Sequence, residues 1–82
     1  MSKNKNVDYP HAALIVSSDK NPIRILKTPD ANSIGLGLVP NATHCIVLNS
    51  IQNGEQHWYW IDLFGTRGYI PHNNLKIIKN KF

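Results

Sequence analysis

The sequence has one cysteine, no long apolar run and no helical periodicity, and each absence excludes a class of protein. A single cysteine cannot form an intramolecular disulfide, so the chain is not a small disulfide-stabilised scaffold. No stretch approaches the roughly 20 apolar residues of a membrane span, and residues 1–6 lead into no apolar run of the kind that a signal peptide needs. If Met1 is the native start, we therefore expect a cytoplasmic protein with no membrane association.

The chain is also short, which limits the kind of site that it can build. Its 82 residues are enough for one domain, and 41% of them are hydrophobic, which is enough for a small core. A chain of this size buries only about 60% of the surface that its unfolded form exposes. We therefore expect one marginally stable domain with little room for a deep active site.

Acidic residues are few, and the formal net charge is +4. Four of the nine basic residues lie near the two ends of the chain, namely Lys3, Lys5, Lys79 and Lys81. The other five bases are balanced by five acids, so the central part is neutral. Because a nucleic-acid-binding domain usually carries a basic face of its own, this distribution argues against a nucleic-acid partner and for charged ends that aid solubility.

Residues that could support catalysis or metal binding lack the necessary partners. The four histidines show no zinc-type spacing with other ligands; they are His11, His44, His57 and His72. We expect Cys45 to be a small buried hydrophobe rather than a nucleophile. Asp62 and His57 share one hairpin, but no third residue completes a catalytic set. We therefore expect no enzyme activity, no metal and no cofactor.

Short apolar segments separated by turn signals predict an all-β domain. The expected strands are residues 11–17, 23–27, 43–48, the two arms of a hairpin within 56–71, and 76–78. Residues 34–39 are apolar, but two glycines argue against a helix there. Residues 49–55 are expected to form a polar loop, and residues 71–75 a tight turn with one turn of 3₁₀ helix. The predicted division is a tail at 1–10, one domain at 11–78 and a tail at 79–82.

The hairpin within residues 56–71 contains both tryptophans, and we expect its turn at residues 65–68. Side chains alternate along a strand, so Trp58, Trp60 and Asp62 share one face. An unpaired buried carboxylate is costly, which makes the opposite face the expected core face. That face carries Tyr59, Ile61 and Leu63. The two tryptophans would then form an exposed apolar patch of the kind that monomers avoid unless it is used.

Residues 68–75, Gly-Tyr-Ile-Pro-His-Asn-Asn-Leu, resemble the closing motif Gly-Tyr-Ile-Pro-Ser-Asn-Tyr-Val of Src homology 3 (SH3) domains, and Trp58 lies ten residues upstream, where that family carries a tryptophan. The order of the shorter motifs is similar to that of the bacterial branch of the family. These motifs are residues 22–25, Pro29, 34–35, 40–41, 46–48 and 58–61. The resemblance covers residues 11–78 and implies a small, five-stranded SH3-like barrel without catalytic machinery.

The resemblance places Trp58 in a ligand groove, flanked by Tyr69 and Pro71, while Asn74 stands where the proline-binding groove of the family has a tyrosine. This departure argues against proline-rich ligands. The candidate ligand-binding residues are Trp58, Trp60, Tyr69, Pro71 and Asn74. Two alternatives remain open: a loop such as residues 28–38, or the N-terminal segment, covers one tryptophan, and Pro71 is only a turn former.

We therefore expect a non-enzymatic module that binds a protein or peptide through an aromatic groove, as an adaptor or inhibitor. A module for cell-wall peptides (peptidoglycan peptides) is the second hypothesis. Single-stranded nucleic-acid binding by base stacking is the third, and a homodimer through the Trp58/Trp60 face is the fourth. If Trp58 is exposed, Trp58→Ala should weaken ligand binding by at least about 1–2 kcal/mol and leave the fold intact.

Overall fold

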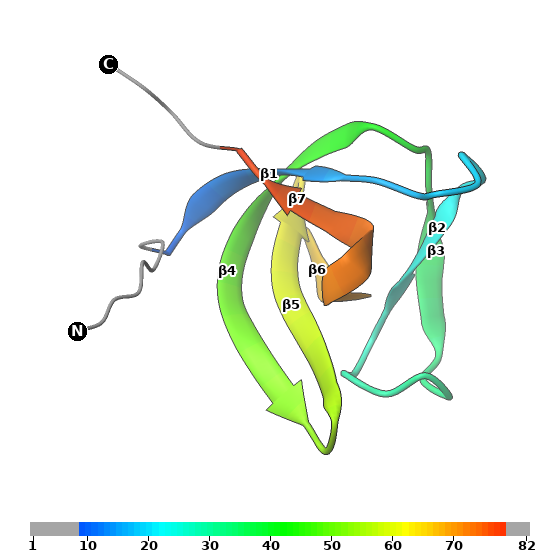
Figure 1. The fold of residues 1–82 in the computed structure, drawn as a ribbon, viewed down its shortest axis with the longest axis vertical. Coiled ribbons are helices and arrows are strands. Elements are labelled where there is room, and N and C mark those ends of the chain that lie inside the picture. Colours follow the sequence, from blue (N-terminus) through cyan, green and yellow to red (C-terminus); the bar gives the residue numbers. More distant parts are fainter. Residues whose placement is uncertain (1–8, 79–82) are drawn as a thin grey trace.

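The computed structural model describes residues 9–78, which form seven strands and one turn of 3₁₀ helix (Figure 1). These elements are β1 (His11–Ile15), β2 (Ile23–Leu26), β3 (Gly35–Val39), β4 (Thr43–Asn53), β5 (Gln56–Leu63), β6 (Thr66–Pro71), η1 (His72–Asn74) and β7 (Leu75–Ile77). Within this range there is no α-helix, so the all-β prediction is confirmed, and no helix is long and apolar enough to span a membrane. Apart from residues 9 and 10, the predicted tails at 1–10 and 79–82 lie outside the described residues.

The strands of this part of the chain form one antiparallel sheet in the order β3-β2-β6-β5-β4-β1-β7. Three consecutive strands, β4, β5 and β6, make up its centre, and β1 joins β4 to β7. The end strands β3 and β7 are not paired with each other, so the sheet is open. The expectation of a five-stranded barrel is therefore not confirmed.

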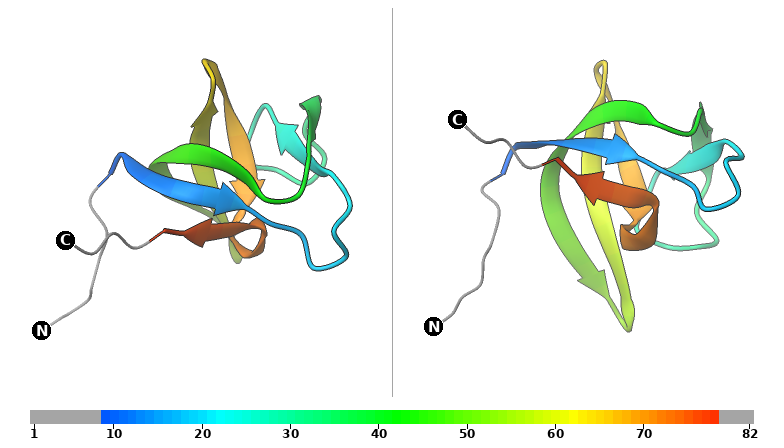
Figure 2. Two further views of the ribbon diagram at one scale, coloured as in Figure 1. Left: turned by 90° about the horizontal axis from the view of Figure 1, so that it is seen from above. Right: turned by 45° about the horizontal axis from the view of Figure 1, so that its top comes forward.

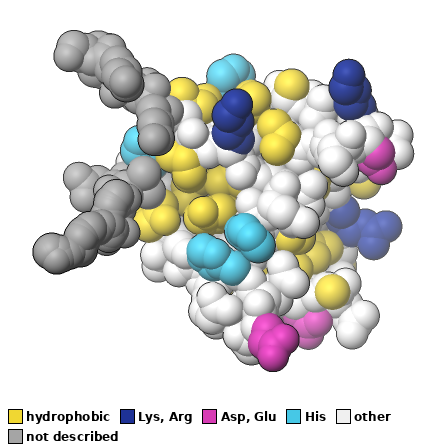
Figure 3. Space-filling model, viewed as in Figure 1, with side chains coloured by type: hydrophobic (Ala, Val, Ile, Leu, Met, Phe, Trp, Pro, Cys, Tyr) yellow, Lys and Arg dark blue, Asp and Glu magenta, His cyan; other side chains and the backbone are white. Residues whose placement is uncertain are grey.

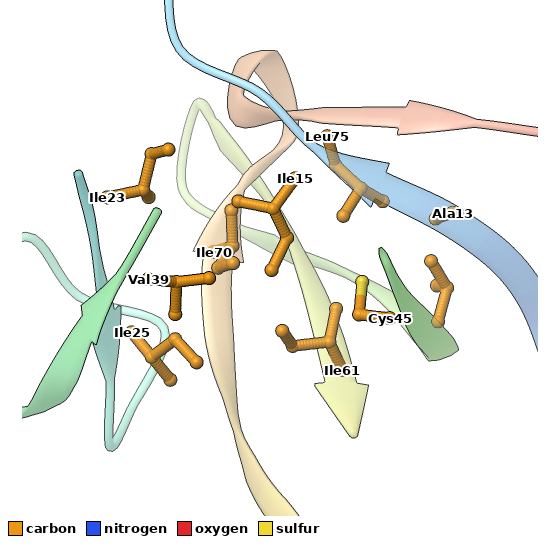
Figure 4. Close-up of a cluster of buried hydrophobic side chains, with 10 residues drawn as sticks. Ala13, Ile15, Ile23, Ile25, Val39, Cys45, Ile61, Ile70 and Leu75 are labelled. Atoms are coloured by element: carbon orange, nitrogen blue, oxygen red, sulfur yellow. The ribbon is translucent and has the colours of Figure 1, made fainter. Parts of the chain in front are cut away.

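The sheet curls around one core, to which strands from both of its ends contribute (Figure 4). Ile15 and Ile70 lie near the centre of this cluster and are fully buried. Ile25 and Val39 approach from the β2–β3 side, and Ile61 from β5. Tyr59 and Leu63 pack against the same cluster, which confirms the predicted core face of β5.

Strand β4 runs to Asn53, so the prediction of a loop over residues 49–55 is wrong for residues 49–53. Its register shifts between Val47, which lies opposite Ile61, and Asn49, which lies opposite Trp60. The extra residue, Leu48, is a β-bulge, which bends a strand and increases its twist. Pairing with β5 holds this polar stretch in a strand despite its low β-propensity.

The turn between β5 and β6 consists of Phe64 and Gly65, not of residues 65–68 as predicted, because Leu63 and Thr66 lie directly opposite each other. Phe64 has a φ of 53° and Gly65 a φ of 94°. Positive φ at both central residues is the geometry of a type I′ hairpin turn, which matches the twist of the flanking strands. The sequence concealed this turn because phenylalanine is unusual at such a position.

The β2–β3 hairpin joins the rest of the sheet through a narrow contact beside Gly68, and Figure 2 shows this hairpin to one side of β4, β5 and β6. The register between β2 and β6 contains one residue pair, Leu26 with Tyr69. A Cβ atom on Gly68 would lie 2.3 Å from Ile25 Cγ2 and 2.9 Å from the Leu26 carbonyl oxygen. Glycine is therefore required where β6 and β2 approach each other.

Candidate functional site

A groove with a volume of about 460 Å³ lies beside the β2–β3 hairpin. It is lined by residues from three separate parts of the chain. The first part is the segment 17–26, which connects β1 to β2 and includes β2. The second is the β2–β3 hairpin, through Ala31 and Leu38. The third is the end of the aromatic hairpin and the turn after it, and it contributes three of the five predicted site residues, Trp58, Pro71 and Asn74.

Trp58 is buried, with only 2% of its surface exposed, so the interpretation that it stands exposed on the outer face is wrong. It does not belong to the main core cluster, and neither does the buried Leu26, which lines the groove with it. Two residues of the segment 28–38, Ala31 and Leu38, line the same groove, and both are exposed. Side-chain alternation along one strand could not reveal this burial, because it depends on packing against other parts of the chain.

The indole N–H of Trp58 is closed to solvent and has no hydrogen-bond acceptor among residues 9–78. A buried donor without a partner costs roughly 1–3 kcal/mol, so most folded proteins avoid one. This atom is the sole buried side-chain nitrogen or oxygen without a partner in the described part of the chain. Next to the groove, the fold therefore buries a hydrogen-bond donor that it does not itself use.

Pro71 and Asn74 line the groove with Trp58, and each is positioned by a different structural feature. Pro71 is directly opposite Trp58 in the β5–β6 pair. The side-chain amide of Asn74 donates from Nδ2 to the Val16 carbonyl oxygen at 2.9 Å, and the Val16 N–H donates to the Asn74 carbonyl oxygen at 2.9 Å. Asn74 thus ties η1 to the end of β1, and both residues are half-buried.

Trp60 and Tyr69, the other two predicted site residues, do not line this groove. They are cross-strand partners, and their rings stack with centroids 6.4 Å apart at an interplanar angle of 23°. The guanidinium of Arg67 lies 5.6 Å from the Trp60 ring centroid, in a cation–π contact. The structure therefore separates the predicted set into a groove group and a half-buried stack on the neighbouring surface.

The groove lining carries one acidic and one basic side chain, which sequence reasoning did not assign to the site. Asp19 accepts hydrogen bonds from the Ser17 hydroxyl, from the Asn21 N–H at 3.0 Å and from Asn21 Nδ2 at 3.1 Å. The Ser17 hydroxyl first, and then the Asn21 donors, hold the pKa of Asp19 below its ordinary value, so this carboxylate is charged at neutral pH. Arg24, the basic member, is exposed. The polar stretch 17–21 signalled only a turn.

Polar side chains elsewhere form small clusters with other partners. The His57 ring bonds to the Ser50 hydroxyl and stacks on His72, with centroids 5.3 Å apart. Figure 3 shows two histidine side chains together on the face seen there. Asp62 instead accepts bonds from the Gly65 N–H at 2.9 Å and from Arg67 Nε at 3.1 Å. No group of three or more potential metal ligands occurs within residues 9–78.

A second, smaller hollow of about 210 Å³ lies next to the β5–β6 turn, and its lining includes Cys45, Ile46 and Phe64. Cys45 is buried in the core, as predicted, and burial raises the pKa of its thiol to about 11. Phe64 is 93% exposed. Exposed Ile46 and Phe64 give this hollow apolar surface, and His44 and Asp62 add polar groups to its lining.

No protein-family model, curated protein or solved structure matches the chain. The resemblance to Src homology 3 domains therefore rests on the motifs within residues 11–78. The groove and the chemistry of its lining residues therefore carry the functional argument.

Proposed function

We propose that the chain is a non-enzymatic module that binds a peptide, or an extended segment of a protein, in the groove beside Trp58. The unused indole N–H of Trp58 is the observation that carries this proposal. A backbone carbonyl of a peptide is a strong acceptor that would satisfy this donor once the atoms that close it to solvent move aside. Binding would then remove the cost that the free protein bears for an unpaired N–H.

The rest of the lining fits a ligand that is partly apolar and partly polar. Leu26, Leu38 and Pro71 supply apolar contacts, and the side chains of Asn21, Asp19 and Arg24 supply polar ones. Binding sites commonly combine an apolar lining with a few polar groups that fix the orientation of the ligand. The charged Asp19 and Arg24 favour a ligand that presents one positive and one negative group, as a peptide does.

The proposed fold is a variant of the SH3-like barrel, and the topology supports it. Strands β1, β4, β5, β6 and β7 would be its five strands, with the β2–β3 hairpin as an insertion between β1 and β4. The shared core supports this assignment, because Ala13, Ile61 and Leu75 pack in one cluster although they come from different strands. The bulge at Leu48 supplies the bend that such a curved sheet needs.

A proline-rich ligand is not the one that we propose. Proline-rich segments bind in grooves lined by several aromatic rings. Among residues 9–78, Trp58 is the one aromatic side chain in the lining, since Tyr69 stacks on Trp60 instead. Asn74 adds no aromatic ring to the groove, and its side-chain amide already donates a hydrogen bond to the Val16 carbonyl oxygen.

Selection from a phage-displayed random-peptide library tests the proposed function. We expect the selected peptides to lose at least about 1 kcal/mol of affinity, or roughly fivefold, for Leu38→Ala, because Leu38 lines the groove and is 67% exposed. Phe64→Ala is the matched control, since it also removes an exposed apolar side chain but lies outside the groove. Peptides that lose affinity for Phe64→Ala and not for Leu38→Ala would contradict the proposal.

A further inference from the structure

The turn between β5 and β6 carries a phenylalanine whose ring the fold leaves in solvent. Phe64 has a φ of 53°, a conformation that is unfavourable for most side chains and that glycine, asparagine and aspartate adopt more readily. Its side chain is 93% exposed and does not belong to the core cluster of residues 9–78. Figure 2 shows this turn at the protruding end of the β5–β6 hairpin. The fold therefore bears the cost of this residue without burying its ring.

A hollow and a second exposed apolar side chain lie beside this ring. The hollow of about 210 Å³ is lined by Phe64 itself and by His44, Cys45, Ile46 and Asp62. The side chain of Ile46 is 42% exposed. Sites for drug-sized ligands usually occupy about 300–1,000 Å³. The hollow is smaller than that, and it therefore fits a single side chain better than a whole ligand.

Charges of both signs accompany the apolar side chains on this surface. Asp62 lines the hollow and accepts a hydrogen bond from Arg67 Nε at 3.1 Å. The Arg67 side chain is 58% exposed, so its guanidinium can reach a group outside the molecule. A two-fold axis through such a surface can bring each arginine toward the other copy's aspartate. The surface is therefore complementary in charge to itself.

We propose that the surface around the β5–β6 turn pairs with the same surface of a second copy of the chain. We call it the Phe64 face, and it consists of Ile46, Asp62, Phe64 and Arg67. A two-fold interface uses one patch on both subunits, so that patch has to be self-complementary. The Phe64 face has both the protruding ring and a hollow of side-chain size. None of its residues lines the groove beside Trp58, so the pairing goes beyond the proposed function and is independent of it.

Sedimentation velocity of the full chain, over concentrations from about 0.01 to about 1 mM, tests the pairing. An interface anchored by one ring from each copy is small, so we expect a dissociation constant on the order of 0.1 mM. Phe64→Asn removes the ring and creates the Asn-Gly sequence that a type I′ turn favours, so the fold is retained. Because the change acts on both copies, we expect this constant to rise roughly 25-fold or more, or about fivefold for each ring.

Ile34→Asn is the matched control, since Ile34 is 70% exposed and lines neither the groove nor the hollow. We expect it to leave self-association unchanged. Urea denaturation of dilute, monomeric protein should show Phe64→Asn to be at least as stable as the wild type. A wild type that stays monomeric throughout would overturn the pairing, and so would equal weakening by the two variants. Loss of stability in Phe64→Asn would also overturn it, because the ring would then support its own fold.

Dilution of the ¹⁵N-labelled protein, followed by nuclear magnetic resonance, locates the surface that pairs. Trp58 precedes Phe64 by six residues along β5, a distance of about 20 Å in a strand. We expect the backbone amide resonances of Ile46 and Phe64 to shift with concentration and the Trp58 indole resonance to stay in place. If both tryptophan indole resonances shift and the Ile46 amide does not, the copies pair through the Trp58/Trp60 face and this inference is wrong.

Discussion

At the scale of the residue, burial and one unpaired N–H define what Trp58 does. Its 2% exposure makes it a structural residue as well as a candidate binding residue. The expectation that Trp58→Ala leaves the fold intact is therefore replaced by a different one. Any test of binding at this position needs a substitution that keeps the apolar volume.

Trp58→Phe and Trp58→Ala should separate these two roles. Truncation of a buried tryptophan to alanine costs about 3–5 kcal/mol of unfolding free energy. Phenylalanine retains most of the apolar volume and removes the unpaired N–H, so we expect Trp58→Phe to lie within about 1 kcal/mol of wild type. Urea denaturation followed by circular dichroism measures both. If Trp58→Phe destabilises the protein as much as Trp58→Ala, the N–H has a partner in solution.

Cys45 should be unreactive in the folded protein. Burial raises the pKa of its thiol from 9.0 to about 11, and only the thiolate reacts with disulfide reagents. At about pH 8 this lowers the thiolate fraction roughly 100-fold, and burial adds a steric barrier. Reaction with a chromogenic disulfide should therefore be slow and should accelerate in denaturant. Reaction of the native protein at the rate of a free thiol would show that Cys45 is accessible.

At the scale of the element, the β2–β3 hairpin depends on Gly68 for its place against β6. Gly68→Ala would bring a Cβ atom to 2.9 Å from the Leu26 carbonyl oxygen, and backbone cannot easily yield. We expect a loss of about 1–3 kcal/mol in unfolding free energy, measured by urea denaturation.

The matched control for this prediction is Gly35→Ala. There the new Cβ would lie 2.7 Å from Arg24 Cδ, and the flexible arginine side chain can move away. We therefore expect a smaller loss of stability than for Gly68→Ala. A loss at Gly35 that equals or exceeds the loss at Gly68 would contradict the interpretation that backbone contact with β2 fixes the hairpin.

The turn between β5 and β6 should show a pH dependence that originates at Asp62. The Gly65 N–H first, and then Arg67, lower the pKa of Asp62 below its ordinary value of 3.8. A carboxylate whose pKa is lower in the folded state than in the unfolded state stabilises the fold at any pH above its unfolded-state pKa. This stabilisation is lost as the pH falls through the folded-state pKa. Asp62→Asn should therefore flatten the loss of stability below about pH 4. If thermal unfolding scans show the same fall in melting temperature at acid pH for Asp62→Asn and for the wild type, this role of Asp62 is contradicted.

The sequence predicts the elements better than it predicts their ends and their packing. The strands around 11–15, 23–26 and 43–47, the core face of β5 and the 3₁₀ turn at 72–74 follow from apolar alternation and turn residues. The polar half of β4 and the turn at Phe64 do not, because bulges and strand register override local propensity. The burial of Trp58 depends on packing against distant parts of the chain, and no local pattern encodes it.

At the scale of the whole molecule, the charges of residues 9–78 nearly cancel. This range contains five basic and four acidic residues, so its formal net charge is +1. Basic side chains are scattered over the face seen in Figure 3. We therefore expect weak binding to a fluorescein-labelled oligothymidine, measured by anisotropy, with no plateau at physiological salt. Tight binding with a steep fall in affinity as salt rises would favour the nucleic-acid hypothesis instead.

The two tryptophans allow the most direct test of the central claim, that a peptide binds in the groove beside Trp58. Trp58 lines the groove, whereas Trp60 stacks on Tyr69 outside it, so their two indole N–H resonances report the two surfaces separately. On titration of the ¹⁵N-labelled protein with a selected peptide, we predict that the Trp58 indole resonance shifts and that the Trp60 resonance stays in place. A shift of the Trp60 resonance with an unmoved Trp58 resonance would contradict the claim.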